Sequence, residues 1–496
     1  MSSQYILALD LGTTSARAII FDAEGSTVSL AQKAYSQNYP NPGWVEQDPF
    51  DLSQTQIAVA QQALQQANLT ASEIAALGIT NQRESTVVWD RASGQPIYPA
   101  IIWQDRRTAT MCEQWKADGV EDFVCERTGL HLDPYFSASK LRWILDRVPN
   151  AQERAKRGEL AFGTLDSWLI WSLTKGQYHV TDASNASRSL LFNLDTGTWD
   201  DELLHLFKIP PAILPAIVES SGAIAAVADP EDLAGITIAG IAGDQQAGLF
   251  GQTCFDVGSV KNTYGTGCFM LMNTGTRPVM SKNLLTTVAW QIDGQLEYAV
   301  EGAIFTAGAA IQWLQDELQL IEDAEECDRL ATSVLDTGGV YFVPALTGLA
   351  APYWNAHARG MLLGLARGTN RAHICRAALE AIAYQVGDAI DCMKSDSALP
   401  LKELRVDGGG ANCNFLMQRQ ADILGISILR PKTTEATALG AAFLAGLGVG
   451  FWPDRAALRS LWKPQTAFHP TLSLAERETA LHQWRQAVAL TLQWKS

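Results

Sequence analysis

The residues of this sequence best suited to chemistry follow a short apolar run near the N-terminus. Asp10 ends this run, and Gly12 permits a tight turn that directs backbone N–H groups towards a ligand. Three hydroxyl residues and an arginine come next: Thr13, Thr14, Ser15 and Arg17. The combination predicts a phosphate-binding turn, with Asp10 placed to hold Mg²⁺ through water. The alternative is an ordinary glycine hairpin with surface hydroxyls, and no GxxxxGK[ST] phosphate loop occurs.

Two more glycine turns follow apolar runs in the second half of the chain. Gly265, Thr266 and Gly267 come after the run 260–264, and residues 407–410 come after the run 404–406. The first turn is suited to phosphates, and the second lets a flat ligand lie against bare backbone. Each turn alone is a weak signal. Three such turns, each at the end of an apolar run, predict a nucleotide site more specifically.

Polar groups that suit a hydroxylated substrate end three other apolar runs. Arg83 and Glu84 follow residues 77–80, Trp103 follows residues 100–102, and Asp244 follows residues 240–243. Ligands of open α/β sheets collect at the carboxyl ends of strands, so we expect these groups to meet. Arginine and glutamate together can bond a polyol, and Asp244 can accept the proton of an attacking hydroxyl. The alternatives are a surface ion pair for Arg83 and Glu84 and a helix N-cap for Asp244.

The elements that must position these residues alternate between strands and helices, which predicts an α/β fold. We expect strands at 6–9, 18–21, 27–31, 77–80, 260–264, 268–272 and 404–406, and helices at 54–66, from about 414, and at 438–452. A strand followed by a glycine turn recurs in each half. The recurrence predicts two domains of related architecture, residues 1–250 and 251–496, around a cleft.

Composition narrows the classes of partner. The 496 residues carry a net charge of −16, so nucleic acid and anionic membranes are not expected partners. The apolar stretch 438–452 is shorter than a membrane span requires. The eight cysteines are scattered and make no CxxC pair, and the seven histidines show no metal-ligand spacing. We therefore expect reduced thiols, a cytoplasmic location and no zinc site.

The chain resembles the FGGY carbohydrate kinases, and within that family the glycerol kinases. The resemblance extends from about residue 6 to residue 452. Its motifs are residues 42–49, 78–84, 133–137, 185–188, 243–246 and 262–269, and a second signature from Gly360 through Gly364 to His373 and Glu380.

The resemblance implies the actin-like ATPase (ribonuclease H-like) fold and transfer of the γ-phosphoryl group of ATP to glycerol with Mg²⁺. The product would be sn-glycerol 3-phosphate, and the reaction would be the entry step of glycerol catabolism. Family members are often homodimers or homotetramers. Asp244 would be the general base. Carried over by position, the glycerol site would be Arg83, Glu84, Trp103, Tyr135, Asp244, Gln245 and Phe269. The nucleotide would meet Thr13, Thr14, Ser15, Arg17, Thr266, Gly308, Gln312 and Gly409.

Two positions depart from the family pattern: Leu11 replaces a glutamine, and Cys413 replaces an asparagine expected near adenine. Two other functions remain open on the residues alone. One is a kinase of another small polyol or ketose, which would need a wider pocket than Trp103, Tyr135 and Phe269 suggest. The other is a non-catalytic actin-like nucleotide-binding protein, which has no use for a base such as Asp244.

Overall fold

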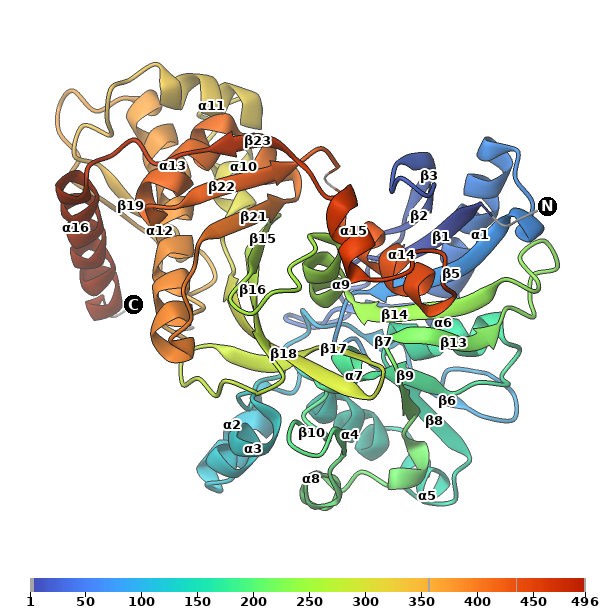
Figure 1. The fold of residues 1–496 in the computed structure, drawn as a ribbon. Coiled ribbons are helices and arrows are strands. Elements are labelled where there is room, and N and C mark those ends of the chain that lie inside the picture. Colours follow the sequence, from blue (N-terminus) through green and yellow to red (C-terminus); the bar gives the residue numbers. More distant parts are fainter. Residues whose placement is uncertain (1–3, 356, 434, 495–496) are drawn as a thin grey trace.

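The computed structural model describes residues 4–355, 357–433 and 435–494, which fold around two mixed β-sheets (Figure 1). The first sheet has the order β13-β14-β5-β1-β2-β3. Its strands are β1 (Tyr5–Leu11), β2 (Ser15–Phe21), β3 (Thr27–Ala34), β5 (Ile74–Asn81), β13 (Ser221–Ala226) and β14 (Thr237–Gly243). Strands β1, β5 and β14 are mutually parallel, whereas β2, β3 and β13 are antiparallel to their neighbours.

The second sheet repeats this plan. Its order, from one edge, is β23-β22-β21-β15-β16-β18, followed by one additional strand, β17. Its strands are β15 (Val260–Tyr264), β16 (Cys268–Gly275), β17 (Leu285–Ile292), β18 (Gln295–Ile304), β21 (Glu403–Asp407), β22 (Ser427–Pro431) and β23 (Pro464–Phe468). Strands β15, β21 and β22 are parallel, and the others pair antiparallel, in the same positions as in the first sheet. The expected duplication of architecture is confirmed.

Two helices pack against each other where the two sheets meet. Helix α9 (Asp244–Gly251) follows β14, and helix α14 (Ala436–Gly448), from the C-terminal part of the chain, packs on β1, β5 and β14 of the first sheet. Glycines allow the close approach. A Cβ at Gly78 would lie 2.1 Å from the carbonyl oxygen of Ala441, and one at Gly440 would lie 1.7 Å from that of Ala247. The sequence therefore joins the two halves through backbone contact as well as through apolar side chains.

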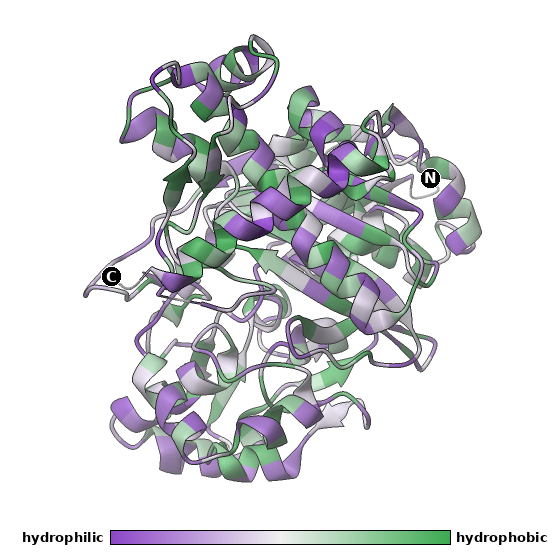
Figure 2. Cartoon of the chain, turned by 90° about the vertical axis from the view of Figure 1, so that its left-hand side faces the viewer, coloured by the Kyte–Doolittle hydropathy of each residue, from purple (hydrophilic) through white to green (hydrophobic). Residues whose placement is uncertain are grey.

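Helices cover the outer faces of both sheets. Helix α1 (Pro49–Ala67) packs on β2 and β3, and its first turn is capped by Asp48, whose side chain accepts from the backbone N–H of Phe50. Helices α12 (Arg371–Ser397) and α13 (Asn414–Leu424) pack on strands of the second sheet, and α10 (Gly308–Asp316), α11 (Ala324–Thr332) and α16 (Leu474–Gln493) pack against these two helices. Peripheral helices alternate hydrophilic and hydrophobic residues, as helices with one buried face do (Figure 2).

A mixed region between β5 and β13 forms the lower part of the molecule in Figure 1. Its helices are α2 (Ala109–Ala117), α3 (Glu121–Thr128), α4 (Ser137–Arg147), α5 (Ala151–Lys156), α6 (Leu165–Leu173), α7 (Ala183–Ala186) and α8 (Asp201–Leu206). Its strands are β6 (Val87–Asp90), β7 (Ala100–Ile101), β8 (Leu160–Gly163), β9 (Val180–Asp182), β10 (Phe192–Asn193), β11 (Thr198–Trp199) and β12 (Ala216–Val218). The remaining elements are β4 (Glu46–Gln47), β19 (Tyr341–Val343), β20 (Met361–Leu363) and α15 (Arg455–Leu461).

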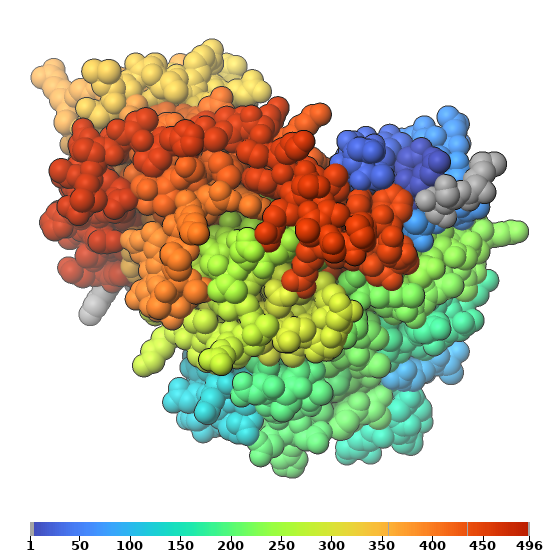
Figure 3. Space-filling model, in the orientation of Figure 1, coloured from blue at the N-terminus to red at the C-terminus, as the bar shows by residue number. Residues whose placement is uncertain are grey.

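The strands and helices expected from the sequence are confirmed, and several extend beyond the expected bounds: the helix expected from residue 54 begins at Pro49. The apolar helix expected to reach residue 452 ends at Gly448, because the chain turns back and the Phe451 N–H bonds the Gly446 carbonyl at 2.8 Å. Within the described residues, no helix combines the length and apolarity needed to cross a bilayer. The space-filling view shows a notch at the top between the C-terminal elements and the first fifty or so residues (Figure 3).

Candidate active site

The register of the first sheet explains why polar residues distant in sequence meet. Asp10 pairs with Thr80, and both Leu11 and Gly243 pair with Asn81. The carboxyl ends of β1, β5 and β14 are therefore level, and the residues that follow them emerge at one edge of the sheet. This arrangement brings together the predicted groups of the phosphate turn, of the Arg83–Glu84 segment and of the start of α9.

A buried ion network lies at this edge. The Arg83 Nε atom is 3.2 Å from Asp244 Oδ1, and Arg83 Nη1 is 2.5 Å from Glu301 Oε2. Arg188 completes the network, with Nε 2.7 Å from Glu84 Oε1 and Nη2 3.0 Å from Glu301 Oε1. The side chains are at most 2% exposed, except that of Asp244, which is 29% exposed. The surface-pair alternative for Arg83 and Glu84 is therefore wrong, and Asp244 is the member of the network open to a ligand.

Asp244 is the first residue of α9, and its carboxylate accepts from the backbone N–H of Gln245 at 2.7 Å. The N-cap position itself belongs to Gly243, so the cap alternative does not account for the aspartate. Burial raises the pKa of Asp244, whereas the positive charges of Arg83 and Lys261 act to lower it. A carboxylate whose pKa is raised takes up a proton more readily, and the two cations limit that rise.

Three aromatic rings form a wall beside this network. The Trp103 ring meets Tyr135 and Phe269 edge to face, with centroid separations of 5.7 and 6.5 Å. The indole N–H of Trp103 donates to the Thr13 hydroxyl at 3.0 Å. The aromatic wall therefore joins the predicted substrate residues to the phosphate turn.

The phosphate turn is closed by a hydrogen bond from Gly12 N to Ser15 O at 3.1 Å, and Gln47 donates to the Thr13 carbonyl at 2.9 Å. Arg17 lies between two carboxylates, 2.5 Å from Asp10 and 2.7 Å from Glu435. Burial raises the pKa of Asp10, and Arg17 opposes this shift. In this structure Arg17 holds Asp10 and Glu435 in place beside the turn, and its proposed contact with phosphate remains a prediction.

The nucleotide residues predicted in the second half gather at the corresponding edge of the second sheet. Thr263 pairs with Asp407, so the turns that follow β15 and β21 are level. The Gly308 N–H, at the start of α10, donates to the Gly265 carbonyl at 3.1 Å, and a Cβ at Gly308 would lie 2.7 Å from that oxygen. Thr266, Gln312 and Gly409 are exposed around these turns.

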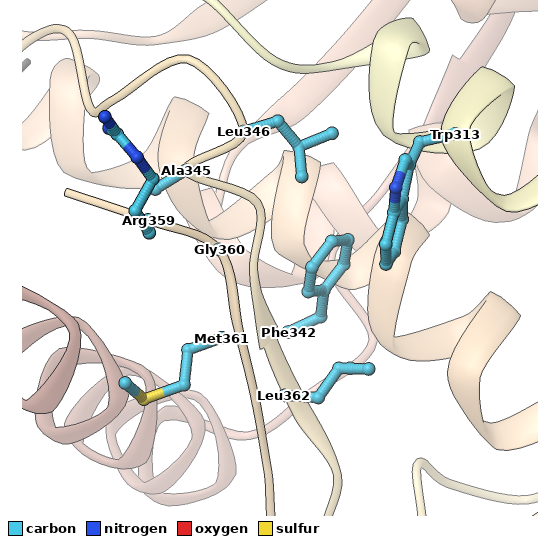
Figure 4. Close-up of a pocket in the computed structure, with 8 residues that line it drawn as sticks. All are labelled: Trp313, Phe342, Ala345, Leu346, Arg359, Gly360, Met361 and Leu362. Carbon is cyan, nitrogen blue, oxygen red and sulfur yellow. The ribbon is translucent and has the colours of Figure 1, made fainter. Parts of the chain in front are cut away.

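The departure at Cys413 has a local explanation. Its sulfur accepts from the Leu416 N–H at 3.4 Å, so the residue caps α13. A separate cavity of about 210 Å³ lies between α10 and the β19–β20 pair (Figure 4). The stacked rings of Trp313 and Phe342 line it, with Gly360 and Met361 of the second signature. No carboxylate lines this cavity, so we assign it no catalytic role.

Sequence reasoning does not find several charged residues of the site. Arg188 ends one of the family motifs without an expected role, and Glu301, Lys261 and Glu435 carry no expectation. For Glu301 and Lys261 the available signal is a charge within a largely apolar strand, since such a charge is buried only when it is paired. Lys261 is fully buried, with Nζ donating to Gln245 Oε1 and, at 2.8 Å, to Thr263 Oγ1.

Comparisons with known proteins agree with this geometry. Residues 5–251 match the N-terminal domain of the FGGY family of carbohydrate kinases, and residues 260–449 match the C-terminal domain. The chain is 56% identical to a glycerol kinase of Stenotrophomonas maltophilia over 99% of both chains. It is 55% identical to a glycerol kinase of Alkaliphilus oremlandii over 99% of this chain and 98% of that protein. The crystal structure of Plasmodium falciparum glycerol kinase with ADP superimposes with a TM-score of 0.93 at 35% identity, covering 99% of both chains. The chain therefore belongs to the FGGY family of carbohydrate kinases and has the actin-like ATPase fold.

Proposed function

We propose that this protein is an ATP-dependent glycerol kinase, which transfers the γ-phosphoryl group of ATP to glycerol and releases sn-glycerol 3-phosphate and ADP. The observation that carries the proposal is the placement of Asp244. Its carboxylate lies 3.2 Å from Arg83, beside an aromatic wall that is hydrogen-bonded to the phosphate turn through Trp103 and Thr13. Identity of 55–56% to glycerol kinases over nearly the full chain supports the same substrate.

In the proposed mechanism, Arg83, Glu84 and Asp244 bond the hydroxyls of glycerol, and Gln245 assists them. Trp103, Tyr135 and Phe269 pack on its three carbons. Asp244 accepts the proton of the attacking glycerol hydroxyl. The hydroxyl oxygen bonds to the γ-phosphorus while the bond between that phosphorus and the β–γ bridging oxygen breaks, which releases ADP. Arg83 stays charged throughout, because burial opposes its charge less than the neighbouring carboxylates favour it, and its pKa is well above the ordinary value.

The nucleotide is proposed to lie between the two sets of turns. Backbone and hydroxyl groups of the Thr13–Thr14–Ser15 turn would hold the transferred phosphate, with Arg17 beside it, and Thr266 would meet the phosphates from the second sheet. Gly308, Gln312 and Gly409 would line the nucleoside pocket, where exposed glycine backbone permits close approach.

Two carboxylates fit the Mg²⁺ that accompanies ATP. Asp10 and Asp244 are close enough for the charge of Asp10 to raise the pKa of Asp244, and such carboxylates bind Mg²⁺ with several waters retained. The ion would supply positive charge near the phosphates. The protein's own contribution there is Arg17, which orients Asp10.

Eight cysteines without disulfides support a reducing, cytoplasmic location for the protein. We also propose a homodimer or homotetramer, as expected from the family resemblance, and a division into domains at residues 250 and 251. Light scattering after size-exclusion chromatography measures the assembly directly.

A coupled ADP-release assay tests the substrate. Glycerol, dihydroxyacetone, erythritol, xylulose and ribulose should be compared at equal ATP, and glycerol should give the highest kcat/KM. A higher kcat/KM with a larger polyol or with a ketose would mean that this compound, and not glycerol, is the substrate. Absence of turnover with all five, despite nucleotide binding, would support the non-catalytic alternative.

Asp244→Asn tests the base. Loss of a general base lowers kcat by about 10²- to 10⁴-fold, while ATP binding should stay intact. Asp454→Asn is the matched control, because Asp454 caps α15 by accepting from Ala457 N at 2.8 Å and lies outside the site. Activity of the Asp244→Asn variant at the unmodified level would refute the assignment.

A further inference from the structure

A cluster of three different metal-binding side chains lies outside the site described above. Glu121 and Cys125 are one turn apart on α3, and Gly129, with φ of +70°, reverses the chain so that His131 returns to them. The potential ligand atoms of the three residues all lie within 4.8 Å of one another. The Cys125 sulfur is 3.7 Å from His131 Nδ1.

We propose that Glu121, Cys125 and His131 bind a divalent cation of the Zn²⁺ class, with water as the fourth ligand. Zinc bonds thiolate sulfur at about 2.3 Å and imidazole nitrogen at about 2.0–2.1 Å. Tetrahedral geometry then separates the two ligand atoms by about 3.6 Å. The 3.7 Å separation between Cys125 and His131 matches that value without movement of either side chain.

Neighbouring groups contact two of the three side chains, Glu121 and His131. The Leu132 N–H donates to Glu121 Oε1 at 3.3 Å, and Lys116 Nζ lies 3.9 Å from the same oxygen. The His131 ring packs against Trp354 with centroids 5.6 Å apart. Its Nε2 atom is buried and has no hydrogen-bond partner within the described part of the chain, so among those residues the ring bonds protein only through Nδ1, which faces the Cys125 sulfur.

The chemistry of the cluster separates it from the proposed Mg²⁺ site. Thiolate and imidazole select zinc-like cations, whereas the oxygen-only set at Asp10 and Asp244 suits Mg²⁺. The segment after the cluster leads directly to Tyr135 of the aromatic wall. The loop that carries His131 is also bonded to the second half of the chain, because the Thr286 N–H donates to the Gly129 carbonyl at 2.9 Å. A bound cation would fix this segment to α3.

The spacing of cysteines and histidines predicted no such site, because the ligands are separated by three and five residues and come from a helix and the loop beyond it. The close approach depends on the reversal at Gly129 rather than on a repeated sequence motif. The proposal therefore departs from the expectation of no zinc site, and it does so on the arrangement of the side chains rather than on their spacing.

Cobalt(II) is a suitable probe, added to the full-length protein after chelator treatment and without nucleotide. We expect one equivalent to give thiolate-to-cobalt charge-transfer absorption, which Zn²⁺ displaces and excess Mg²⁺ does not. Cys125→Ser should abolish the band, and His131→Gln should weaken binding at least about tenfold. Cys392→Ser is the matched control, since that half-buried thiol lies 3.5 Å from Asp396 and belongs to no three-residue cluster found among the described residues.

Two readouts keep the test decisive if a variant folds poorly. Zn²⁺ should raise the unfolding temperature of the unmodified protein, because a ligand that binds only the native state stabilises it. Zn²⁺ should also slow alkylation of Cys125, measured by peptide mass, and leave that of Cys392 unchanged. A charge-transfer band that persists in Cys125→Ser, or no band and no protection of Cys125 in the unmodified protein, would overturn the proposal.

Discussion

Glu301 and Arg83 form an ion pair with 2.5 Å between Oε2 and Nη1, although they are 218 residues apart and belong to different halves of the chain. Glu301 lies on β18 of the second sheet, and Arg83 follows β5 of the first. Burial alone would raise the pKa of Glu301, but Arg188 and Arg83 outweigh it and lower the pKa to about 2. The carboxylate is therefore a fixed negative charge that connects the second sheet to the substrate site.

Glu301→Gln should impair glycerol use more than ATP use. The amide keeps the shape but leaves two buried guanidiniums without their shared counter-charge, and removing one partner of such a pair costs about 3–5 kcal/mol. We expect kcat/KM for glycerol to fall at least tenfold, with KM for ATP little changed. Glu297→Gln is the control, because Glu297 lies on the same strand and pairs with Arg455 at 2.6 Å, away from the site. Equal kinetic effects of the two variants would show that Glu301 has no positioning role.

Lys261→Met should move the acid limb of the kcat/KM profile to higher pH. Asp244 must be ionised to accept a proton, and the charge of Lys261 is one of the two that lower its pKa. Without that charge the pKa of Asp244 rises, so activity is lost at a higher pH as the solution is acidified. Lys261→Arg keeps the charge and should leave the limb nearer its original position. If the acid limb does not move in Lys261→Met, the charge of Lys261 does not influence the pKa of the base.

Trp103→Phe tests the connection between the aromatic wall and the phosphate turn. Phenylalanine keeps a ring beside Tyr135 and Phe269 but lacks the indole donor to Thr13. The net contribution of such a hydrogen bond is about 0.5–1.5 kcal/mol, so kcat/KM should fall roughly two- to tenfold. Trp89→Phe is the control, because the Trp89 indole N–H is buried with no partner within the described residues. If the control loses as much activity, the effect comes from packing and not from the Thr13 contact.

The site residues that directly follow the ends of strands could be predicted from the sequence. Asp10, Arg83 and Asp244 each come after an apolar run, and parallel strands in register bring such positions together without further information. Glu301 and Lys261 lie inside strands of the second sheet, and their partners lie on other elements. A single charge in an apolar run indicates that a partner exists, but only the packing of the two sheets identifies Arg83 or Gln245. Arg17 and Glu435, 418 residues apart, meet because α14, which begins after Glu435, packs on the first sheet.

His179→Gln should make stability less dependent on pH. The His179 Nε2–H donates to the Phe162 carbonyl at 2.7 Å, and Nδ1 accepts from Arg91 at 3.0 Å, so the native ring is neutral. Burial lowers its pKa from 6.5 to about 4. The unfolded chain therefore binds the proton first on acidification, and native stability is lost as the pH falls from 6.5 towards 4.

The expected loss from His179 is about 2 kcal/mol between pH 7 and pH 5, measured by urea unfolding. Glutamine can satisfy the same two partners without titrating, so its variant should lose correspondingly less over this interval. His205→Gln, on the exposed side of α8, should behave like the unmodified protein. Identical pH dependence for His179→Gln and the unmodified protein would show that this ring titrates alike in both states.

Gly440→Ala should reduce both stability and activity, because α9 and α14 meet at backbone distance there. The added Cβ would lie 1.7 Å from the carbonyl oxygen of Ala247, which is three residues after Asp244 on the same helix. Backbone must move to relieve this contact, and overpacking of this kind costs about 1–3 kcal/mol or more. The movement carries the start of α9 with it, so the distance between Asp244 and Arg83 should change and kcat should fall. Gly368→Ala is the control, since a Cβ there would meet nothing within 4 Å. Thermal unfolding and kcat should be measured together: a stability loss with unchanged kcat would mean that α9 holds the base independently of α14.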